Sequence, residues 1–212
     1  MITMSKEIQQ FDSLGLDYET LETATNCKVL SVGVVPFNKG EQASFDELRN
    51  RESSLYVKFL LSGQEKYDLV ESEDTLIWWE KQGEAARFVI QPADHDLELP
   101  EAMQLIADHI IKWVQPIVRN GSSLYARGYD FDGGITLNLF EVTGVESPIK
   151  HYNRLRCIRT AIDELAGTNT GYTDTPKPEH MIPHHSLHDI SWDIAELVVL
   201  QRRQQQFLKG VK

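Results

Sequence analysis

The sequence contains little cysteine and no long apolar run. Cys27 and Cys157 are the only cysteines among 212 residues, which argues against a disulfide-rich secreted fold and predicts two reduced thiols. No segment approaches the roughly 18 consecutive apolar residues of a membrane-spanning helix, and the first residues lack the apolar centre of a secretory signal. We therefore expect a cytoplasmic protein that does not associate with membranes.

Basic residues are also scarce. Lys and Arg number 21 against 32 Asp and Glu, so the formal net charge is −11. This charge argues against a protein that coats nucleic acid by attraction to the phosphate backbone, but it leaves room for a local basic patch. The candidate arginines for such a patch are Arg87, Arg119 and Arg127, or Arg154, Arg156 and Arg159. The alternative interpretation is that these are ordinary solvated side chains.

The composition is globular, and the order of the elements indicates an α/β fold. Apolar residues make up 41% of the chain and charged residues 25%, both typical of globular proteins. The length predicts a single domain, residues 1–212, with its core at about 14–200. Three β-rich segments come first, at residues 13–19, 28–37 and 54–61, and they suit an antiparallel meander.

The later part of the chain alternates between helices and strands. Helices are predicted from Glu73, over 99–117, 135–142 and 160–166, and from Leu187, and strands over 122–126 and 154–158. The segment 167–183 is rich in Thr, Gly and Pro and is expected to be a loop. Gly33 lies inside the second strand, which predicts a bulge or a close approach of another backbone segment. This order predicts a mixed sheet flanked by helices.

Two carboxylates near the N-terminus are placed to share one face of a strand. Side chains alternate along a strand, so Asp17 and Glu19 project together while Tyr18 projects to the other face. Two carboxylates on one face repel each other unless a cation lies between them, and a divalent metal ion is the usual cation. The alternative is that both residues end a strand at a solvated edge.

A histidine-rich segment near the C-terminus adds a third carboxylate and a titratable base. His184 is followed five residues later by Asp189. Together with the N-terminal pair, these residues indicate a metal-dependent hydrolase that cleaves phosphodiesters. A zinc site on His184 and His188 is a weaker interpretation, because His185 stands where the metalloprotease pattern has Glu.

Asp189 also has a purely structural interpretation. Residues 186–189 match the S-x-x-D capping pattern at the start of a helix. On that helix Asp189 lies away from the apolar stripe, as do Asp193 and Glu196. Such positions are typical of a solvated helix face. A carboxylate at a helix start can nevertheless point into a cleft, so the two interpretations are compatible.

The middle of the chain supplies the remaining candidates. Asp132 follows a glycine-containing turn and is a candidate fourth carboxylate; Asp130 competes with it, and either residue could instead cap the next helix. Trp78 and Trp79 are adjacent on a predicted helix, where neighbouring side chains point about 100° apart. We expect one of them to be buried and the other to reach a cleft and stack on a base.

Taken together, these residues resemble the DEDD family of 3′–5′ exonucleases, in its histidine-bearing branch (DEDDh). The motifs that carry the resemblance are Asp17-Tyr18-Glu19-Thr20, Phe131-Asp132, and His184 with Asp189. The resemblance extends from about Leu14 to Leu200.

Within that family the chain is most similar to the phage exodeoxyribonuclease A type, grouped with ribonuclease T-like enzymes. The supporting residues are the Trp78-Trp79 pair, Gln82, Ala86-Arg87, Arg127-Gly128 and the His-x-Ser-Leu-His-Asp segment. Two segments depart from the pattern: Gly133-Gly134 replaces a bulkier residue and Pro, and Cys157 replaces an Asp. Both departures bear on the shape of the cleft.

The resemblance implies a ribonuclease H-like fold and a 3′–5′ exonuclease that hydrolyses single-stranded DNA to nucleoside 5′-monophosphates with two Mg²⁺ or Mn²⁺ ions. It implies that Asp17, Glu19 and Asp189 hold the first ion, and that Asp17 bridges to the second ion, which Asp132 helps to hold directly or through water. His184 would take a proton from the attacking water. The implied substrate-binding residues are Thr20, Trp78, Trp79, Gln82 and Arg127.

Two alternatives stay open. The same chemistry could act on RNA ends, because discrimination of the 2′-hydroxyl depends on one or two contacts in the cleft. The chain could also be a catalytically silent nucleic-acid-binding module on this fold, since a fold alone does not imply an activity. The sequence is compatible with a monomer or a homodimer, and with the host cytoplasm as the location if the chain is phage-encoded.

Overall fold

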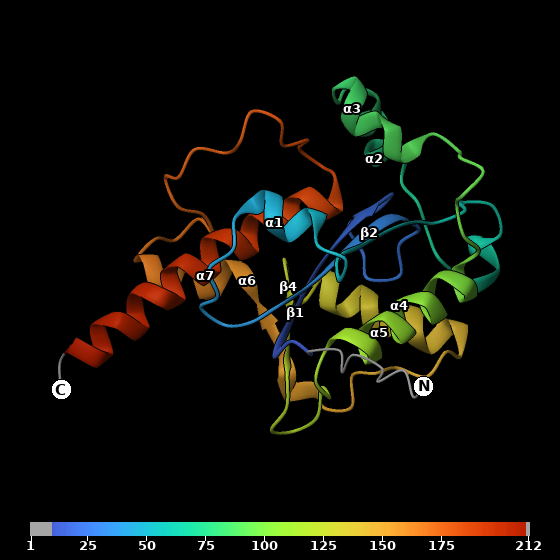
Figure 1. Cartoon of the computed structure of the whole chain (residues 1–212). Helices are drawn as coiled ribbons and strands as arrows, with labels where there is room; N and C mark the ends of the chain where they lie inside the picture. The colour runs from blue at the N-terminus through green and yellow to red at the C-terminus, as the bar shows by residue number, and fades with distance from the viewer. Residues whose placement is uncertain (1–9, 211–212) are drawn as a thin grey trace, which may run out of the picture.

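A five-stranded mixed sheet forms the centre of the molecule (Figure 1). The computed structural model describes residues 10–210. The strands are β1 (Ser13–Thr20), β2 (Val29–Phe37), β3 (Leu55–Lys58), β4 (Ser123–Ala126) and β5 (Leu155–Cys157), in the order β3-β2-β1-β4-β5. β2 runs antiparallel to β1 and β3, whereas β4 runs parallel to β1 and β5. The predicted mixed sheet and its antiparallel meander are therefore confirmed.

Helices cover both faces of this sheet (Figure 1). On one face lie α4 (Leu99–Trp113) and α5 (Asp132–Thr143), and on the other α1 (Phe45–Asn50), α6 (Ile158–Ala166) and α7 (Ser186–Gly210). α2 (Glu73–Glu80) and α3 (Glu84–Arg87) stand near the end of β1, and short 3-10 helices span Gln64–Tyr67, Phe88–Ile90 and Tyr152–Arg154. None of the helices within the described residues is long and apolar enough to cross a bilayer.

Two local features differ from the prediction. α4 ends at Trp113 and so excludes Ile117, because Pro116 disfavours helical backbone at the residue before it. The short helix α1 is absent from the predicted elements, although the sequence carries its signal. Ser44 and Glu47 form a capping box at its start, in which each side chain bonds to the backbone of the other residue.

The alternation predicted for β1 is present. Leu14, Leu16 and Tyr18 are buried in the core that the sheet shares with α4 and α5. The intervening residues face α7. Gly15 lies against apolar side chains of α7, and Asp17 lies near Arg127, which also pairs with Asp189 of α7. One strand therefore supplies core packing on one face and carboxylates on the other.

Two glycines allow α7 to lie unusually close to the sheet. A Cβ added to Gly33 would lie 2.5 Å from the Cα of Leu187, and one added to Gly15 would lie 2.5 Å from Ile194 Cδ1. Gly33 pairs with Asp17 in the β1–β2 ladder, so the first turn of α7 rests on β2 directly beside that carboxylate. Of the two roles predicted for Gly33, the structure shows the close backbone approach, and the register irregularity lies elsewhere, at the end of β1.

Gly33→Ala is expected to lower the free energy of unfolding by about 1–3 kcal/mol, the usual cost of overpacking. The clash is with the backbone of α7, which cannot move aside as a flexible side chain can. Gly83→Ala is the matched control, because a Cβ at Gly83 meets nothing within 4 Å. Urea unfolding of both variants measures the effect, and equal midpoints for the two would contradict the close approach.

Candidate active site

The structure brings together the four carboxylates predicted from the sequence. Asp17 and Glu19 come from β1, Asp132 from the first residue of α5 and Asp189 from the first turn of α7, and all four are buried. Asp17, Glu19 and Asp132 line an open cleft of about 540 Å³ together with His184. Side-chain atoms of Glu19, His184 and Asp189 all lie within 4.8 Å of one another.

Asp132 is held at the cleft by two backbone amides. Its Oδ1 accepts a hydrogen bond from the amide of Tyr18 on β1 at 3.1 Å, and its Oδ2 accepts one from the amide of Gly128 at 2.7 Å. These bonds connect the start of α5 to the strand that carries Asp17 and Glu19. Asp130, the competing candidate, also lines the cleft, but its side chain is exposed on the turn and accepts no hydrogen bond from β1 among the described residues. The geometry therefore favours Asp132 as the fourth carboxylate.

A partly buried arginine lies among these acids. Arg127 follows β4, and its Nη1 is 2.6 Å from Asp189 Oδ2 and 3.8 Å from Asp17 Oδ2. Its Nε is 3.2 Å from Asp193 Oδ2, and its Nη2 donates a hydrogen bond to the Tyr172 hydroxyl at 3.0 Å. The predicted substrate-binding Arg127 is thus an internal counter-ion of the cluster in addition to lining the cleft.

The predicted solvated face of the last helix is wrong. Asp189, Asp193 and Glu196 are all buried, and Asp193 is 0% exposed. Arg127 and the segment 167–183 cover this face, since Tyr172 binds Arg127 and the Thr173 hydroxyl donates a hydrogen bond to Glu196. The recurrence of acids on one face of the helix was visible in the sequence, but the partner that buries them was not.

Burial makes the carboxyl groups of the cluster weaker acids than usual. The pKa of Asp17 lies well above its ordinary value, chiefly because the carboxyl is buried and then because Asp132 is close. Burial, followed by repulsion from Asp189, raises the pKa of Glu19 to about 8. Burial also raises the pKa of Asp193 to about 7, against the opposing effect of Arg127. Ionising all of these acids together therefore requires more positive charge than Arg127 alone provides.

The donor set fits a divalent cation. Asp17 Oδ2 is buried without a hydrogen-bond partner among the described residues, and the atoms of Glu19, His184 and Asp189 converge from three segments. Carboxylate oxygens are the ligands that Mg²⁺ and Mn²⁺ prefer. A cation bound there would offset the repulsion that raises the pKa values of these acids.

His184 is held in a left-handed backbone conformation, with φ of 58°. This conformation is uncommon for a residue other than glycine and is found where neighbouring contacts impose it. The His184 ring lies nearly perpendicular to the rings of Trp78 and Trp79, with centroids 4.8 Å and 6.2 Å away. Partial burial lowers the pKa of His184, which favours the neutral imidazole that can accept a proton.

The neighbouring histidines have other contacts. His185 stacks between Tyr56 and His188, at 4.4 Å from each ring. His188 Nδ1 accepts a hydrogen bond from the amide of Ile182. Within residues 10–210, His184 groups with Glu19 and Asp189, and His188 is not a member of that group. These contacts give no support to a zinc site on His184 and His188, and they anchor the loop that carries His184.

One of the two adjacent tryptophans is buried and the other is exposed, as predicted. Trp79 is 1% exposed and its Nε1 donates a hydrogen bond to the Thr20 carbonyl, whereas Trp78 is 41% exposed. Trp78, Trp79, Thr20 and Glu19 line a second cavity of about 410 Å³ beside the carboxylates. Gln82 turns back and donates to the carbonyl of Trp78, and it lines neither this cavity nor the cleft.

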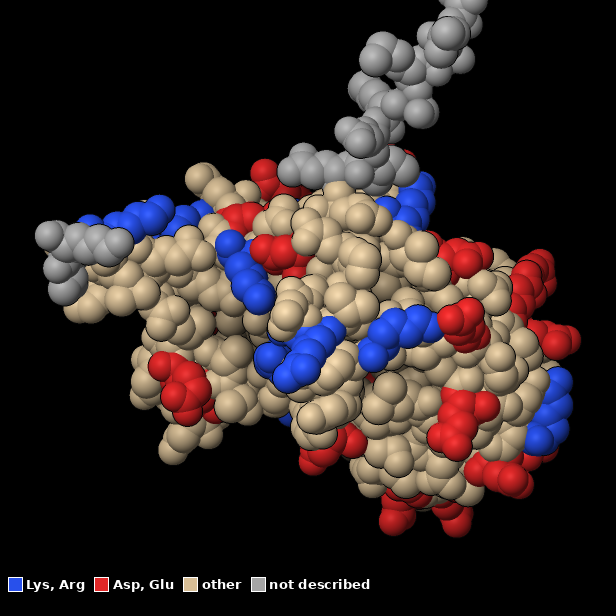
Figure 2. Space-filling view, turned by 90° about the horizontal axis from the view of Figure 1, so that it is seen from below, with Lys and Arg blue, Asp and Glu red and all other residues tan. Residues whose placement is uncertain are grey.

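The arginines do not form one patch. Arg154 is used inside the fold, where its guanidinium donates to the carbonyls of Gly121 and Ser122, and Arg159 lines the cleft. On the face seen in Figure 2, basic side chains of the described residues are separated by acidic and uncharged ones. Of the candidate arginines, Arg127 and Arg159 line the cleft beside the carboxylates.

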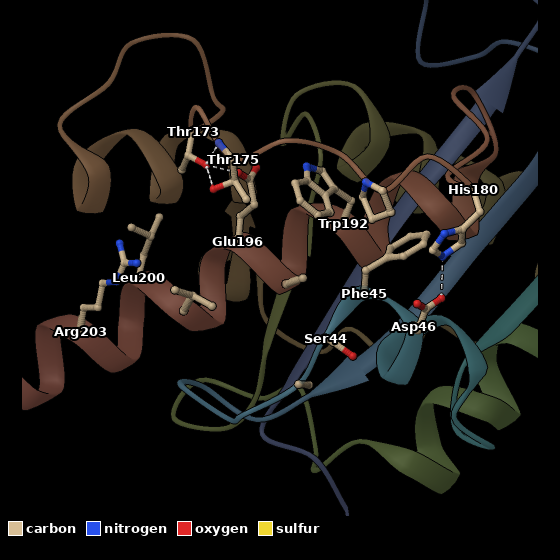
Figure 3. A pocket seen from close by; sticks show the side chains of 14 residues that line it. Ser44, Phe45, Asp46, Thr173, Thr175, His180, Trp192, Glu196, Leu200 and Arg203 are labelled. Carbon is tan, nitrogen blue, oxygen red and sulfur yellow. Dashed lines mark hydrogen bonds and ion pairs between the residues drawn. The ribbon is translucent and has the colours of Figure 1, made fainter.

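A further cavity, of about 470 Å³, lies on the outer side of α7 (Figure 3). Phe45 of α1, Trp192 of α7 and His180 form its aromatic part, and Glu196 reaches it beside Thr173 and Thr175. None of the residues that line it belongs to the carboxylate cluster or to His184. The cleft at the end of β1 and the start of α5, beside the first turn of α7, is therefore the candidate active site.

The family of this chain follows from its sequence. A model described as the 3′-5′ exoribonuclease Rv2179c-like domain matches residues 12–198. The chain belongs to this family. The match spans both β1 carboxylates, Asp132, His184 and Asp189. No curated protein matches the sequence.

Solved structures confirm the fold. Escherichia coli exonuclease I, in a zinc-bound complex with single-stranded DNA, has a TM-score of 0.60 and 14% identity, and the match covers 95% of this chain and 43% of that chain. The RNase domain of yeast Pop2 has a TM-score of 0.56 and 9% identity, with 93% and 78% covered. The Rv2179c-like chain thus spans less than half of exonuclease I. The predicted ribonuclease H-like fold is confirmed.

Without divalent ions, the stability of the protein should fall as pH rises. Glu19 titrates at about 8 in the folded protein, against an ordinary 4.5, so the folded state keeps a proton that the unfolded chain releases between those values. Asp193, at about 7, adds to the fall. Glu19→Gln should reduce the slope, and Glu80→Gln, on the exposed side of α2, should not.

Thermal unfolding in a chelator between pH 5 and pH 8 measures this slope. The pH range lies between the ordinary pKa of Glu19, 4.5, and its pKa in the folded protein, about 8. A flat profile, or an equal slope in the wild type and Glu19→Gln, would contradict a protonated Glu19.

Proposed function

We propose that the Rv2179c-like chain hydrolyses single-stranded nucleic acid from the 3′ end with Mg²⁺ or Mn²⁺, releasing nucleoside 5′-monophosphates. The observation that carries the proposal is the convergence of Asp17, Glu19, Asp132 and Asp189 with His184 at one cleft. All five side chains are present, which argues against the catalytically silent module.

The roles of the residues follow from their positions. Asp17, Glu19, Asp132 and Asp189 would hold the divalent ions, which when bound supply charge stabilisation for an in-line displacement at phosphorus. His184 lies beside Glu19 and Asp189, where an imidazole nitrogen can take the proton of an attacking water. The two amides that bind Asp132 fix its carboxylate relative to β1.

The end of the strand would lie against the aromatic pair. Trp78 offers an exposed ring at the cavity next to Glu19, and stacking on an aromatic ring accepts any base. Trp79 is buried and donates a hydrogen bond to the carbonyl of Thr20, so its role is to position the side of this cavity that Thr20 and Trp78 form. Arg127 and Arg159 on the other side of the cleft would attract the phosphates of the strand.

Single-stranded DNA is the substrate that the resemblance to exodeoxyribonuclease A favours, and exonuclease I, which shares the fold, is seen bound to single-stranded DNA. RNA is the second candidate, because the matching family is described as exoribonucleases. Both substrates present the same phosphodiester to the carboxylates. The choice depends on contacts to the 2′ position of the terminal sugar.

A labelled oligonucleotide tests the activity and the substrate. With 5′-labelled DNA and RNA of one sequence and Mg²⁺ or Mn²⁺, the wild type should produce a ladder that shortens from the 3′ end. Asp132→Asn should lose roughly 100-fold or more in rate, because changes even to residues that support metal ligands cost up to that factor. Asp130→Asn, two residues away at the exposed rim of the cleft, should lose far less than Asp132→Asn.

The faster substrate decides between DNA and RNA. If the oligonucleotides stay intact with Mg²⁺ and with Mn²⁺, the catalytic proposal is wrong and the binding module is favoured. Equal losses in Asp130→Asn and Asp132→Asn would overturn the assignment of Asp132.

Trp78→Ala should raise KM roughly tenfold for a single-stranded oligonucleotide, because stacking on one base is worth about 1–3 kcal/mol. The effect on KM should exceed the effect on kcat. Tyr152→Ala, which removes a ring that is 82% exposed and lines neither cavity, is the control and should leave KM unchanged. Steady-state kinetics measure both variants, and an unaltered KM in Trp78→Ala would remove Trp78 from the substrate site.

A further inference from the structure

Arg127 contacts the carboxylate oxygens that a divalent ion would need. Its Nη1 is 2.6 Å from Asp189 Oδ2 and 3.8 Å from Asp17 Oδ2. Positive charge of either kind stabilises the same two carboxylates. The guanidinium and a divalent ion therefore compete for them.

Asp193 supplies a partner for Arg127 away from the cleft. It lies one helical turn after Asp189 on the same face of α7, it is 0% exposed, and its Oδ2 is 3.2 Å from Arg127 Nε. Neither oxygen of Asp193 forms a hydrogen bond within residues 10–210, and Arg127 is the cation within ion-pair distance of it there. Asp193 does not line the cleft, so its carboxylate acts on the site through Arg127.

Burial makes a fixed partner necessary. A guanidinium that lost Asp17 and Asp189 to a metal ion and kept no counter-ion would be an unpaired, largely desolvated charge, which is costly. Asp193 stays within ion-pair distance of Nε without a hydrogen bond to it, and the Tyr172 hydroxyl accepts from Nη2 at 3.0 Å. Two of the three nitrogens of Arg127 therefore have partners that a metal ion would not take.

We infer that Arg127 and Asp193 form a counter-charge pair that sets the affinity of the carboxylate cluster for its divalent ion. Arg127 weakens binding by competing for Asp17 and Asp189, and Asp193 limits that competition by holding the guanidinium on the far side. Asp193 is thus a positioning residue for Arg127. The inference rests on the proposed function, because it takes Asp17 and Asp189 as metal ligands.

Binding of Mn²⁺ alone to the full chain, measured by titration calorimetry without nucleic acid, tests the pair. Arg127→Gln should tighten the Mn²⁺ Kd roughly tenfold, within the range of couplings between residues in contact. Asp193→Asn should weaken binding, because the guanidinium then pairs with Asp189 and Asp17 alone. In the Arg127→Gln background, Asp193→Asn should change the Kd by less than about twofold.

The outcomes separate this inference from the proposed function. If the wild type binds no Mn²⁺, or if Glu19→Gln binds as tightly as the wild type, the metal site and the inference both fail. The inference alone fails if the wild type binds Mn²⁺ and Glu19→Gln does not, but the Kd of Arg127→Gln is equal to or higher than that of the wild type. Equal weakening by Asp193→Asn in both backgrounds would show a general charge effect and overturn the role of Asp193.

A folding defect does not leave the inference untested. Removing Arg127 leaves several buried carboxylates without a counter-ion, so circular dichroism must first show that Arg127→Gln is folded. Arg127→Lys is the second variant, because it keeps the charge but a single ammonium cannot reproduce contacts from both Nη1 and Nε. It should bind Mn²⁺ more tightly than the wild type and less tightly than Arg127→Gln, and a Kd equal to that of the wild type would count against the pair.

Discussion

The first turn of α7 rests directly on the backbone of β2, and the position of the carboxylate cluster depends on this contact. Gly33 leaves room for Ser186 and Leu187, and Gly15 leaves room for Ile190 and Ile194. Because Gly33 pairs with Asp17 in the ladder, the helix start that carries Asp189 is placed beside the β1 carboxylates. A side chain at Gly33 would lift the helix and widen the site.

The close contact concentrates negative charge in a buried place. Desolvation raises the pKa values of Asp17, Glu19 and Asp193. Each raised pKa means that ionising the group lowers the stability of the folded state. Arg127 offsets part of this cost, and the amides of Tyr18 and Gly128 offset part at Asp132. The remaining demand for positive charge is what a divalent cation meets.

Much of the fold and the site could be predicted because the signals are local. Period-two alternation identified β1 and the shared face of Asp17 and Glu19, and the 100° step of a helix separated Trp78 from Trp79. The end of α4 and the helix α1 also had local signals, in Pro116 and in the Ser44–Glu47 capping box. The solvated face predicted for α7 failed because helix periodicity locates the apolar core and carries no information on which polar face another segment will cover.

The sequence by itself determined which residues can share a face or an element: the carboxylate pair of β1, the apolar stripe of α7 and the glycines that permit a close approach. These depend on backbone geometry over a few residues, so spacing specifies them. Only the tertiary structure decided that Asp193 is buried, that Arg127 lies among four segments, and that Asp132 rather than Asp130 reaches β1. Those outcomes require residues far apart in the chain to meet, and burial then alters their charge, which no local pattern encodes.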